Sequence, residues 1–123
     1  MLTNTCEVPI RFSEVDSLHV VWHGHYLKFF EDGREAFGKQ FNLGYLDVFN
    51  SDGLAVPIVD LNIQYKRPLE YGDSALIETT FVNSAAAKLV FEYKIYSANH
   101  KFLACTGNST QVFMNPHTKD LYI

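Results

Sequence analysis

The sequence predicts an α+β domain over residues 1–123, in which one long helix lies on an antiparallel sheet. Three observations carry this prediction: a helical stripe of apolar residues, several strand-type segments, and short turn-like separators between the later strands. A length of 123 residues suits one domain, and 47% hydrophobic with 20% charged residues is a globular composition. The expected order is one strand, the helix and then four strands, which gives two layers.

The helix is expected from about Gly24 to Leu43, because apolar residues recur there at spacings of three and four. This stripe consists of Tyr26, Phe30, Gly33, Phe37 and Phe41. The other side is expected to carry the charged residues Lys28, Glu31, Asp32, Arg34, Glu35 and Lys39. A glycine within a helix costs about 1 kcal/mol relative to alanine, so Gly33 is expected to allow close contact with another element. Gly44 is the predicted stop signal.

The strand-type segments flank this helix. Residues 5–12 form the first, and Pro9 favours a place at the sheet edge. Residues 57–67 alternate between polar and apolar side chains, which predicts one apolar face formed by Val59, Leu61, Ile63 and Tyr65. Residues 73–82, 88–96 and 102–114 are further runs joined by short turns, which predicts antiparallel hairpins, and residues 121–123 could add a short last strand. One helix leaves the second face and the edges of such a sheet open, so a homodimer or homotetramer is expected.

Charge and cysteine content disfavour several classes of partner. The net charge is −4, and the chain has only 10 Lys and Arg residues, spread along the sequence, so nucleic acid is not an expected partner. No run approaches the roughly 20 apolar residues of a membrane span, and the expected location is the cytoplasm. Cys6 and Cys105 are expected to be reduced thiols rather than a disulfide.

The segment from Asp16 to Tyr26 carries the residues best suited to chemistry. It places a carboxylate and three histidines directly before the helix, whose first turn offers unpaired backbone N–H groups and the positive end of the helix dipole. Those N–H groups would stabilise a developing oxyanion. A carboxylate beside them could attack a carbonyl or deprotonate a water molecule that does so. The combination suits hydrolysis of an activated acyl group.

Residues 12–34, FSEVDSLHVVWHGHYLKFFEDGR, resemble the hotdog-fold acyl-CoA thioesterases of the 4-hydroxybenzoyl-CoA thioesterase superfamily, and look closest to the bacterial branch associated with the Tol-Pal cluster. A second motif of this family matches residues 65–73, YKRPLEYGD, and the order of elements matches over nearly the whole chain. The resemblance implies a hotdog fold and hydrolysis of the thioester of a small aliphatic or aromatic acyl-CoA. It also implies an active site at a subunit interface. No cofactor is expected.

By position, the resemblance implies that Asp16 is the catalytic carboxylate, acting as nucleophile or general base on the thioester carbonyl. It implies that the backbone N–H groups of His23 and Gly24 polarise the carbonyl oxygen, while the His23 side chain orients substrate or helps to move a proton. At two positions that bear on substrate choice the sequence departs from the family pattern. His19 stands where glycine is usual, and His25 stands where asparagine is usual.

The candidates for substrate binding are His19, Trp22, His25, Lys66 and Arg67. Lys66 and Arg67 could bind the phosphates of coenzyme A or could simply be solvated. Trp22 could instead lie in the core or between subunits, and Asp16 could merely brace its own turn. The three histidines before the helix could hold zinc with a carboxylate, but no clear fourth ligand is present and no metal site is predicted.

Two other functions stay open from the sequence alone. The chain could be a non-catalytic module that binds an acyl thioester, or it could be a thioesterase that acts on acyl carrier protein. A dehydratase of the same fold is disfavoured, because the acid and histidine that such enzymes usually place on the central helix have no counterpart here.

Overall fold

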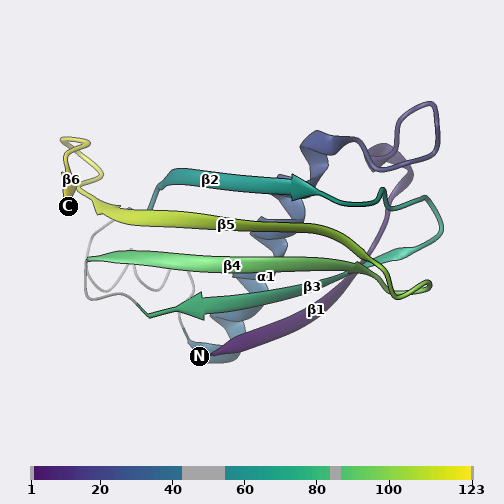
Figure 1. The fold of residues 1–123 in the computed structure, drawn as a ribbon. Helices are drawn as coiled ribbons and strands as arrows, with labels where there is room; N and C mark the ends of the chain where they lie inside the picture. Colours follow the sequence, from purple (N-terminus) through teal and green to yellow (C-terminus); the bar gives the residue numbers. More distant parts are fainter. Residues whose placement is uncertain (1, 43–54, 84–86, 123) are drawn as a thin grey trace.

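The computed structural model describes residues 2–42, 55–83 and 87–122. The elements in chain order are β1 (Thr3–Pro9), two 3₁₀ turns η1 (Phe12–Glu14) and η2 (His23–His25), α1 (Tyr26–Phe41), β2 (Ile58–Tyr65), β3 (Ser74–Val82), β4 (Lys88–Ser97), β5 (Leu103–Met114) and β6 (Leu121–Tyr122). The strands form one sheet in the order β1-β3-β4-β5-β2, and β6 pairs with β5. Helix α1 crosses one face of this sheet (Figure 1), which confirms the predicted α+β arrangement.

The predicted hairpins are present. Strand β3 pairs antiparallel with β4, and β4 with β5, as their short separators indicate. Strand β1 pairs with β3, and β2 pairs with β5, so these two strands form the edges of the sheet. Pro9 is the last residue of edge strand β1, where its missing N–H costs no ladder hydrogen bond.

The apolar stripe of α1 forms the core against the sheet. Tyr26, Phe30, Gly33 and Phe37 are buried and Phe41 is partly buried, which confirms the stripe. Burying a side chain such as Phe30 stabilises the fold by about 1.5–3 kcal/mol. Its ring stacks on the Tyr93 ring of β4, with 4.2 Å between the centroids.

Gly33 lets the helix approach β3 closely, as its position within the stripe predicts. A Cβ atom added at Gly33 would lie 2.9 Å from Cγ2 of Ile77 and would also collide with Oγ1 of Thr79. Real Cβ atoms do not approach neighbours so closely, so only glycine fits at this distance from the strand.

The prediction that Arg34 lies on the solvated side of the helix is wrong. Arg34 is buried, and its Nη1 donates a 2.9 Å hydrogen bond to the Tyr93 hydroxyl. The Tyr93 hydroxyl also lies 2.5 Å from the Ser109 hydroxyl. Arg34 sits one position past Gly33 at the border of the apolar stripe, and its long side chain reaches a polar group beneath the helix.

The helix also ends and begins differently from the prediction. Asn42 has a left-handed φ of 59°, and its N–H bonds to the Gly38 carbonyl, so this residue terminates α1. Gly44 lies outside the described residues. At the other end, the 3₁₀ turn His23–His25 precedes the first α-helical residue, Tyr26.

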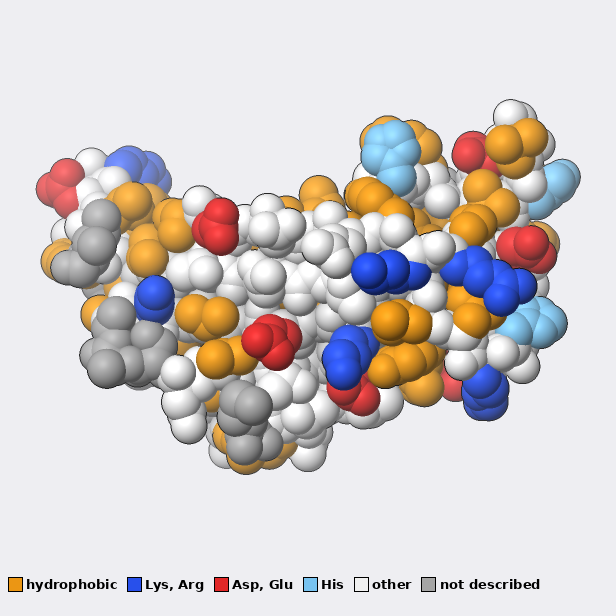
Figure 2. Space-filling model, viewed as in Figure 1, with side chains coloured by type: hydrophobic (Ala, Val, Ile, Leu, Met, Phe, Trp, Pro, Cys, Tyr) orange, Lys and Arg blue, Asp and Glu red, His pale blue; other side chains and the backbone are white. Residues whose placement is uncertain are grey.

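Strand β2 does not bury the apolar face predicted for residues 57–67. The side chains of Val59, Leu61 and Tyr65 are 49%, 37% and 51% exposed, and Ile63 alone is partly buried against the core. The strand lies at the edge beyond β5, and hydrophobic atoms are visible along this edge of the molecule (Figure 2). An exposed edge strand with apolar side chains is a surface that can pair with another chain.

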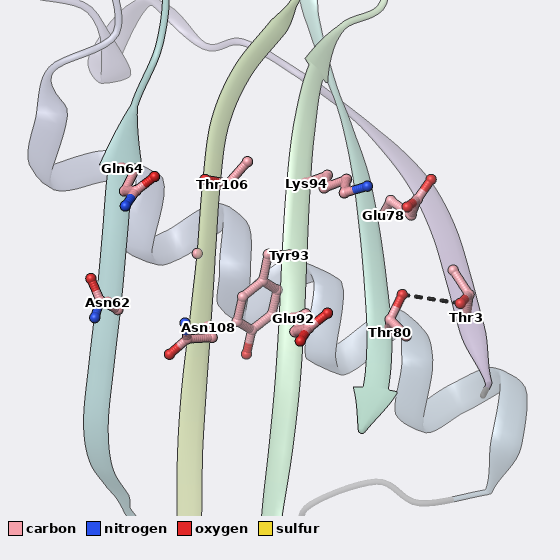
Figure 3. A pocket seen from close by; sticks show the side chains of 11 residues that line it. Thr3, Asn62, Gln64, Glu78, Thr80, Glu92, Tyr93, Lys94, Thr106 and Asn108 are labelled. Atoms are coloured by element: carbon pink, nitrogen blue, oxygen red, sulfur yellow. Dashed lines mark hydrogen bonds between the residues drawn. The ribbon is translucent and has the colours of Figure 1, made fainter. Parts of the chain in front are cut away.

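The sheet face opposite α1 is polar. Figure 3 shows Asn62, Gln64, Glu92, Lys94, Thr106 and Asn108 projecting from β2, β4 and β5 over a hollow of about 630 Å³. The alternation of side chains along each strand puts these residues on the face away from the helix, because buried Thr79 and Tyr93 occupy the other. This face therefore offers amides, hydroxyls and charges rather than an apolar surface.

Candidate active site

The two motifs on which the family resemblance rests form one structural unit. The Val21 N–H donates to the Leu69 carbonyl at 2.8 Å, and the Leu69 N–H donates to the Tyr26 hydroxyl at 3.2 Å. The Tyr71 N–H donates to the His19 carbonyl at 3.1 Å. The loop after β2 is thereby hydrogen-bonded to the segment that leads into α1.

Asp16 occupies an exposed turn before the helix. The turn is closed by hydrogen bonds from the Asp16 N–H to the Val20 carbonyl and from the His19 N–H to the Asp16 carbonyl, each 2.9 Å long. The carboxylate oxygen Oδ1 accepts the Leu18 N–H at 2.8 Å, so Asp16 does brace its own turn. Its second oxygen, Oδ2, has no hydrogen-bond partner among the described residues.

His19 takes the backbone conformation that glycine adopts most easily. Its φ is 63°, in the left-handed region, and its side chain is exposed. His19 therefore carries backbone strain that a glycine at this position would avoid.

The turn before α1 presents free backbone donors. The His25 N–H donates to the Trp22 carbonyl at 2.9 Å, whereas the N–H groups of His23 and Gly24 have no acceptor within the described ranges. Donors of this kind, at the positive end of a helix dipole, are suited to an oxyanion or a polarised carbonyl oxygen.

Trp22 lies against this turn rather than in the core. Its side chain is 49% exposed, and its indole lies 4.8 Å from the His23 ring and 5.5 Å from the His25 ring between centroids. The indole covers Gly24 so closely that a Cβ atom there would lie 2.5 Å from Cη2. Gly24 is thus required for the indole to take this position.

A cavity of about 220 Å³ adjoins the turn. Its lining residues come from the helix entrance, the end of β2, the following loop and β5: Val21, His23, Tyr26, Tyr65, Lys66, Arg67, Pro68 and Ala104. Three predicted site residues, His23, Lys66 and Arg67, therefore meet here. Asp16, His19, Trp22 and His25 are not part of this lining.

Two tyrosines in the cavity were not predicted as site residues. Tyr65 donates a 2.9 Å hydrogen bond from its hydroxyl to the His23 carbonyl, and its ring lies 5.4 Å from the Tyr26 ring between centroids. Burial raises the pKa of both phenols, so both are neutral at neutral pH. The helical spacing predicts Tyr26 only as part of the core stripe, and the sequence signal for Tyr65 is its place at the start of the second motif.

Other nucleophiles and metal ligands gain no support. Burial raises the pKa of the Cys105 thiol to about 11 and, together with the charge of Asp32, raises that of Cys6, so neither forms a thiolate readily at neutral pH. Both cysteines are free thiols, as expected. Among residues 2–42, 55–83 and 87–122, no three His, Cys, Asp or Glu side chains converge as metal ligands.

One long helix packed on a single antiparallel sheet, with the strand order described above, defines a hotdog domain. The chain belongs to the thioesterase-like superfamily, which matches residues 10–121. In the part of the chain that the structure describes, there is no helix with the length and apolar character needed to cross a membrane.

Two curated relatives have names consistent with this superfamily. Over 91 residues the chain is 37% identical to a Bacillus subtilis protein named "Putative acyl-CoA thioesterase YneP", with 74% of this chain and 65% of the relative covered. It is 32% identical over 89 residues to a 1,4-dihydroxy-2-naphthoyl-CoA hydrolase of Microcystis aeruginosa, with 72% and 64% covered. The chain thus spans slightly less than two thirds of the length of these curated relatives.

The solved structures agree on the fold. The crystal structure of a DHNA-CoA thioesterase from Staphylococcus aureus matches with a TM-score of 0.90 at 25% identity, and the match covers 99% of this chain and 80% of that one. The hotdog fold is therefore confirmed.

Proposed function

We propose that this chain hydrolyses acyl-CoA thioesters to a carboxylic acid and coenzyme A. The observation that carries the proposal is the pair of free N–H groups at His23 and Gly24, next to a cavity and directly after a segment whose Val20 and Trp22 are hydrogen-bonded to Asp16 and Glu14. Relatives whose names specify acyl-CoA thioesterase or hydrolase activity support this reading. For the acyl group of the substrate, we propose a small aliphatic or aromatic one.

In the proposed mechanism, the thioester carbonyl oxygen accepts hydrogen bonds from the His23 and Gly24 N–H groups. If Asp16 removes a proton from water, that water forms the new C–O bond, the C–S bond breaks, and the departing thiolate of coenzyme A takes up the proton. If Asp16 attacks the carbonyl carbon itself, the C–S bond breaks to give a mixed anhydride with Asp16, and a water molecule then hydrolyses this anhydride, which releases the carboxylic acid and restores the carboxylate. One well-placed oxyanion donor contributes about 3–4 kcal/mol to the transition state.

We also propose a homodimer as the minimal active unit. Exposed apolar side chains lie along edge strand β2, whose last residue Tyr65 lines the cavity, and exposed Trp22 contacts the His23 ring that lines the same cavity. The sheet face opposite α1 is polar, so a second copy has more apolar surface to bury along the β2 edge than on that face. A homotetramer would need a further interface.

The dimer proposal is tested by light scattering and kinetics on the same samples. Leu61→Lys places a charge on β2 away from the cavity lining and is expected to produce a monomer with reduced activity. Lys94→Gln on the polar face serves as a control and should keep both association and activity. A fully active monomer would reject the interface proposal.

The activity itself is tested by thiol release from short aliphatic, long aliphatic and hydroxy-aromatic CoA esters. Asp16→Asn is the sharpest variant, because an amide oxygen can still accept the Leu18 N–H and keep the turn, whereas it cannot act as nucleophile or base. We expect a loss of at least a hundredfold in kcat with an unchanged melting temperature, in both the presence and absence of a chelator. Near-normal turnover would remove Asp16 from the mechanism.

Two other outcomes of these assays would support the alternative functions. Saturable binding of CoA esters without hydrolysis would identify a non-catalytic binding module. Hydrolysis only of thioesters on acyl carrier protein would identify a carrier-protein thioesterase. Membership of the Tol-Pal-associated branch and a cytoplasmic location stay predictions.

A further inference from the structure

A second cavity continues from the first along the loop after β2. Its volume is about 350 Å³, and its lining includes Tyr71, His100 and Phe102. Arg67 and Pro68 line both cavities. A ligand long enough to extend past Arg67 could therefore occupy both at once.

The second cavity contains a stack of planar side chains. The guanidinium carbon of Arg67 lies 4.2 Å from the centroid of the Phe102 ring, which is a cation–π distance. The His100 ring is nearly parallel to the Phe102 ring, with 7° between their planes and 6.5 Å between centroids. The Arg67 N–H donates to the Ala104 carbonyl at 3.1 Å. The backbone hydrogen bond to Ala104 and the guanidinium contact with Phe102 therefore hold exposed Arg67 at the junction of the two cavities.

Buried Asp73 supports the turn that carries His100. Its carboxylate accepts hydrogen bonds from the Ser97 hydroxyl and from the Ser74 and Asn99 N–H groups. The Ser97 hydroxyl oxygen also accepts the His100 N–H at 2.9 Å. The negative charge of Asp73 is thus engaged by the scaffold, and Glu70 is the exposed acidic residue of this lining.

We propose that this second cavity binds the phosphorylated adenosine end of coenzyme A. The inference rests on the proposed function, because it takes the thioester to lie at the first cavity. Arg67 would bind phosphate oxygens through paired N–H donors, and the purine would stack against Phe102 and His100. Figure 2 shows lysine, arginine and histidine side chains, with acidic ones among them, at this end of the sheet, where β4 turns into β5. The charge of Arg67 in the cavity lining favours an anionic ligand.

This assignment makes the chain selective for free CoA esters over shorter thioesters. An acyl group on N-acetylcysteamine has the same reacting bond but no nucleotide, so it would reach only the first cavity. The ratio of kcat/KM for the two esters of one acyl group therefore measures the contribution of the second cavity.

The kinetic test compares this ratio between wild type and variants. Arg67→Gln and His100→Ala change exposed side chains, and each is expected to lower the ratio, by about tenfold for Arg67→Gln. Lys94→Gln removes one positive charge from the polar sheet face and should leave the ratio as in wild type. A ratio that is equal in wild type and both cavity variants would overturn the proposal.

A binding test does not require catalysis and separates the two proposals. Coenzyme A and adenosine 3′,5′-bisphosphate are titrated calorimetrically into wild type, Arg67→Gln, Phe102→Leu and Lys94→Gln. We expect about tenfold weaker binding of both probes to Arg67→Gln, and weaker binding to Phe102→Leu if its melting curve shows a folded protein. Equal binding to wild type and Arg67→Gln, or no binding of either probe to wild type at millimolar concentration, would reject the nucleotide site even if thioesters are hydrolysed. Selective binding without hydrolysis would support it while the proposed activity fails.

Discussion

The hydroxyl of Tyr65, at the end of β2, donates a 2.9 Å hydrogen bond to the carbonyl oxygen of His23 in the turn before α1. The His23 carbonyl and the Gly24 N–H belong to the same planar peptide group, in which the two bonds point in opposite directions. By holding the carbonyl, Tyr65 therefore also sets the direction of the Gly24 N–H. Tyr65 is a positioning residue for this donor of the proposed oxyanion site.

Tyr65→Phe should lower kcat by about three- to tenfold with little change in KM. The variant keeps the ring contact with Tyr26 but lets the His23–Gly24 peptide rotate. A neutral hydrogen bond at an exposed site contributes only about 0.5–1.5 kcal/mol, so the melting temperature should change little. Steady-state kinetics on one CoA ester measures kcat and KM separately, and the exposed Tyr122→Phe variant is the control. An unchanged kcat would show that the turn holds its peptide without Tyr65.

Gly33→Ala should destabilise the protein by about 1 kcal/mol, although alanine is the better helix former. The gain in helix propensity is about 1 kcal/mol, whereas overpacking against a rigid neighbour costs about 1–3 kcal/mol. The added methyl group would meet Ile77 and Thr79, which stand on central strand β3. Urea denaturation measures the effect, and Glu35→Ala on the exposed side of the helix should be nearly neutral. A stabilised Gly33→Ala protein would mean that α1 can move away from β3 at little cost.

His19→Gly should stabilise the protein by about 0.5–1 kcal/mol. Histidine with a left-handed φ of 63° carries backbone strain of about 1–2 kcal/mol, which glycine relieves, although glycine also makes the unfolded chain more flexible. Ser17→Gly in the same turn is the matched control, because Ser17 does not have a positive φ and should lose stability. Equal losses in both variants would indicate that the His19 side chain stabilises the turn in another way.

Asp73 should make the stability of the fold depend on acidic pH. Burial alone would raise its pKa, but hydrogen bonds from Ser97, Asn99 and Ser74 outweigh burial and hold the pKa below its ordinary value of 3.8. The folded state therefore binds a proton at Asp73 less readily than the unfolded state does. The stabilisation is full above the unfolded pKa and is lost as the pH falls through the folded pKa.

Asp73→Asn tests this linkage. At pH 7 the variant should be about 2 kcal/mol less stable, because hydrogen bonds to a buried charged group are lost or weakened. The difference from wild type should begin to shrink as the pH falls below about 4, where the unfolded chain starts to bind a proton at Asp73, and it should be lost as the pH falls through the lower pKa of the folded state. Denaturation curves from pH 3 to 7 measure the difference, and exposed Asp120→Asn should show none. A constant difference over this range would contradict the assignment.

Local sequence patterns determined the helix and the later hairpins. The period of the stripe around Phe30 and Gly33 is a property of neighbouring residues, and so are the short turns between β3, β4 and β5. The Asp16 turn and the loop of residues 65–73 were predicted from two motifs far apart in the chain. Their roles in catalysis stay proposals.

Only the tertiary structure decided which faces are covered and which distant groups meet. Arg34 is buried because a hydroxyl of β4 lies within its reach, and β2 is exposed because it pairs beyond β5 at the sheet edge. The hydrogen bond between Tyr65 and His23 joins residues 42 positions apart. The period of apolar residues in the sequence indicates which side of a helix or strand is apolar. Strand order and long-range pairing determine what that side contacts.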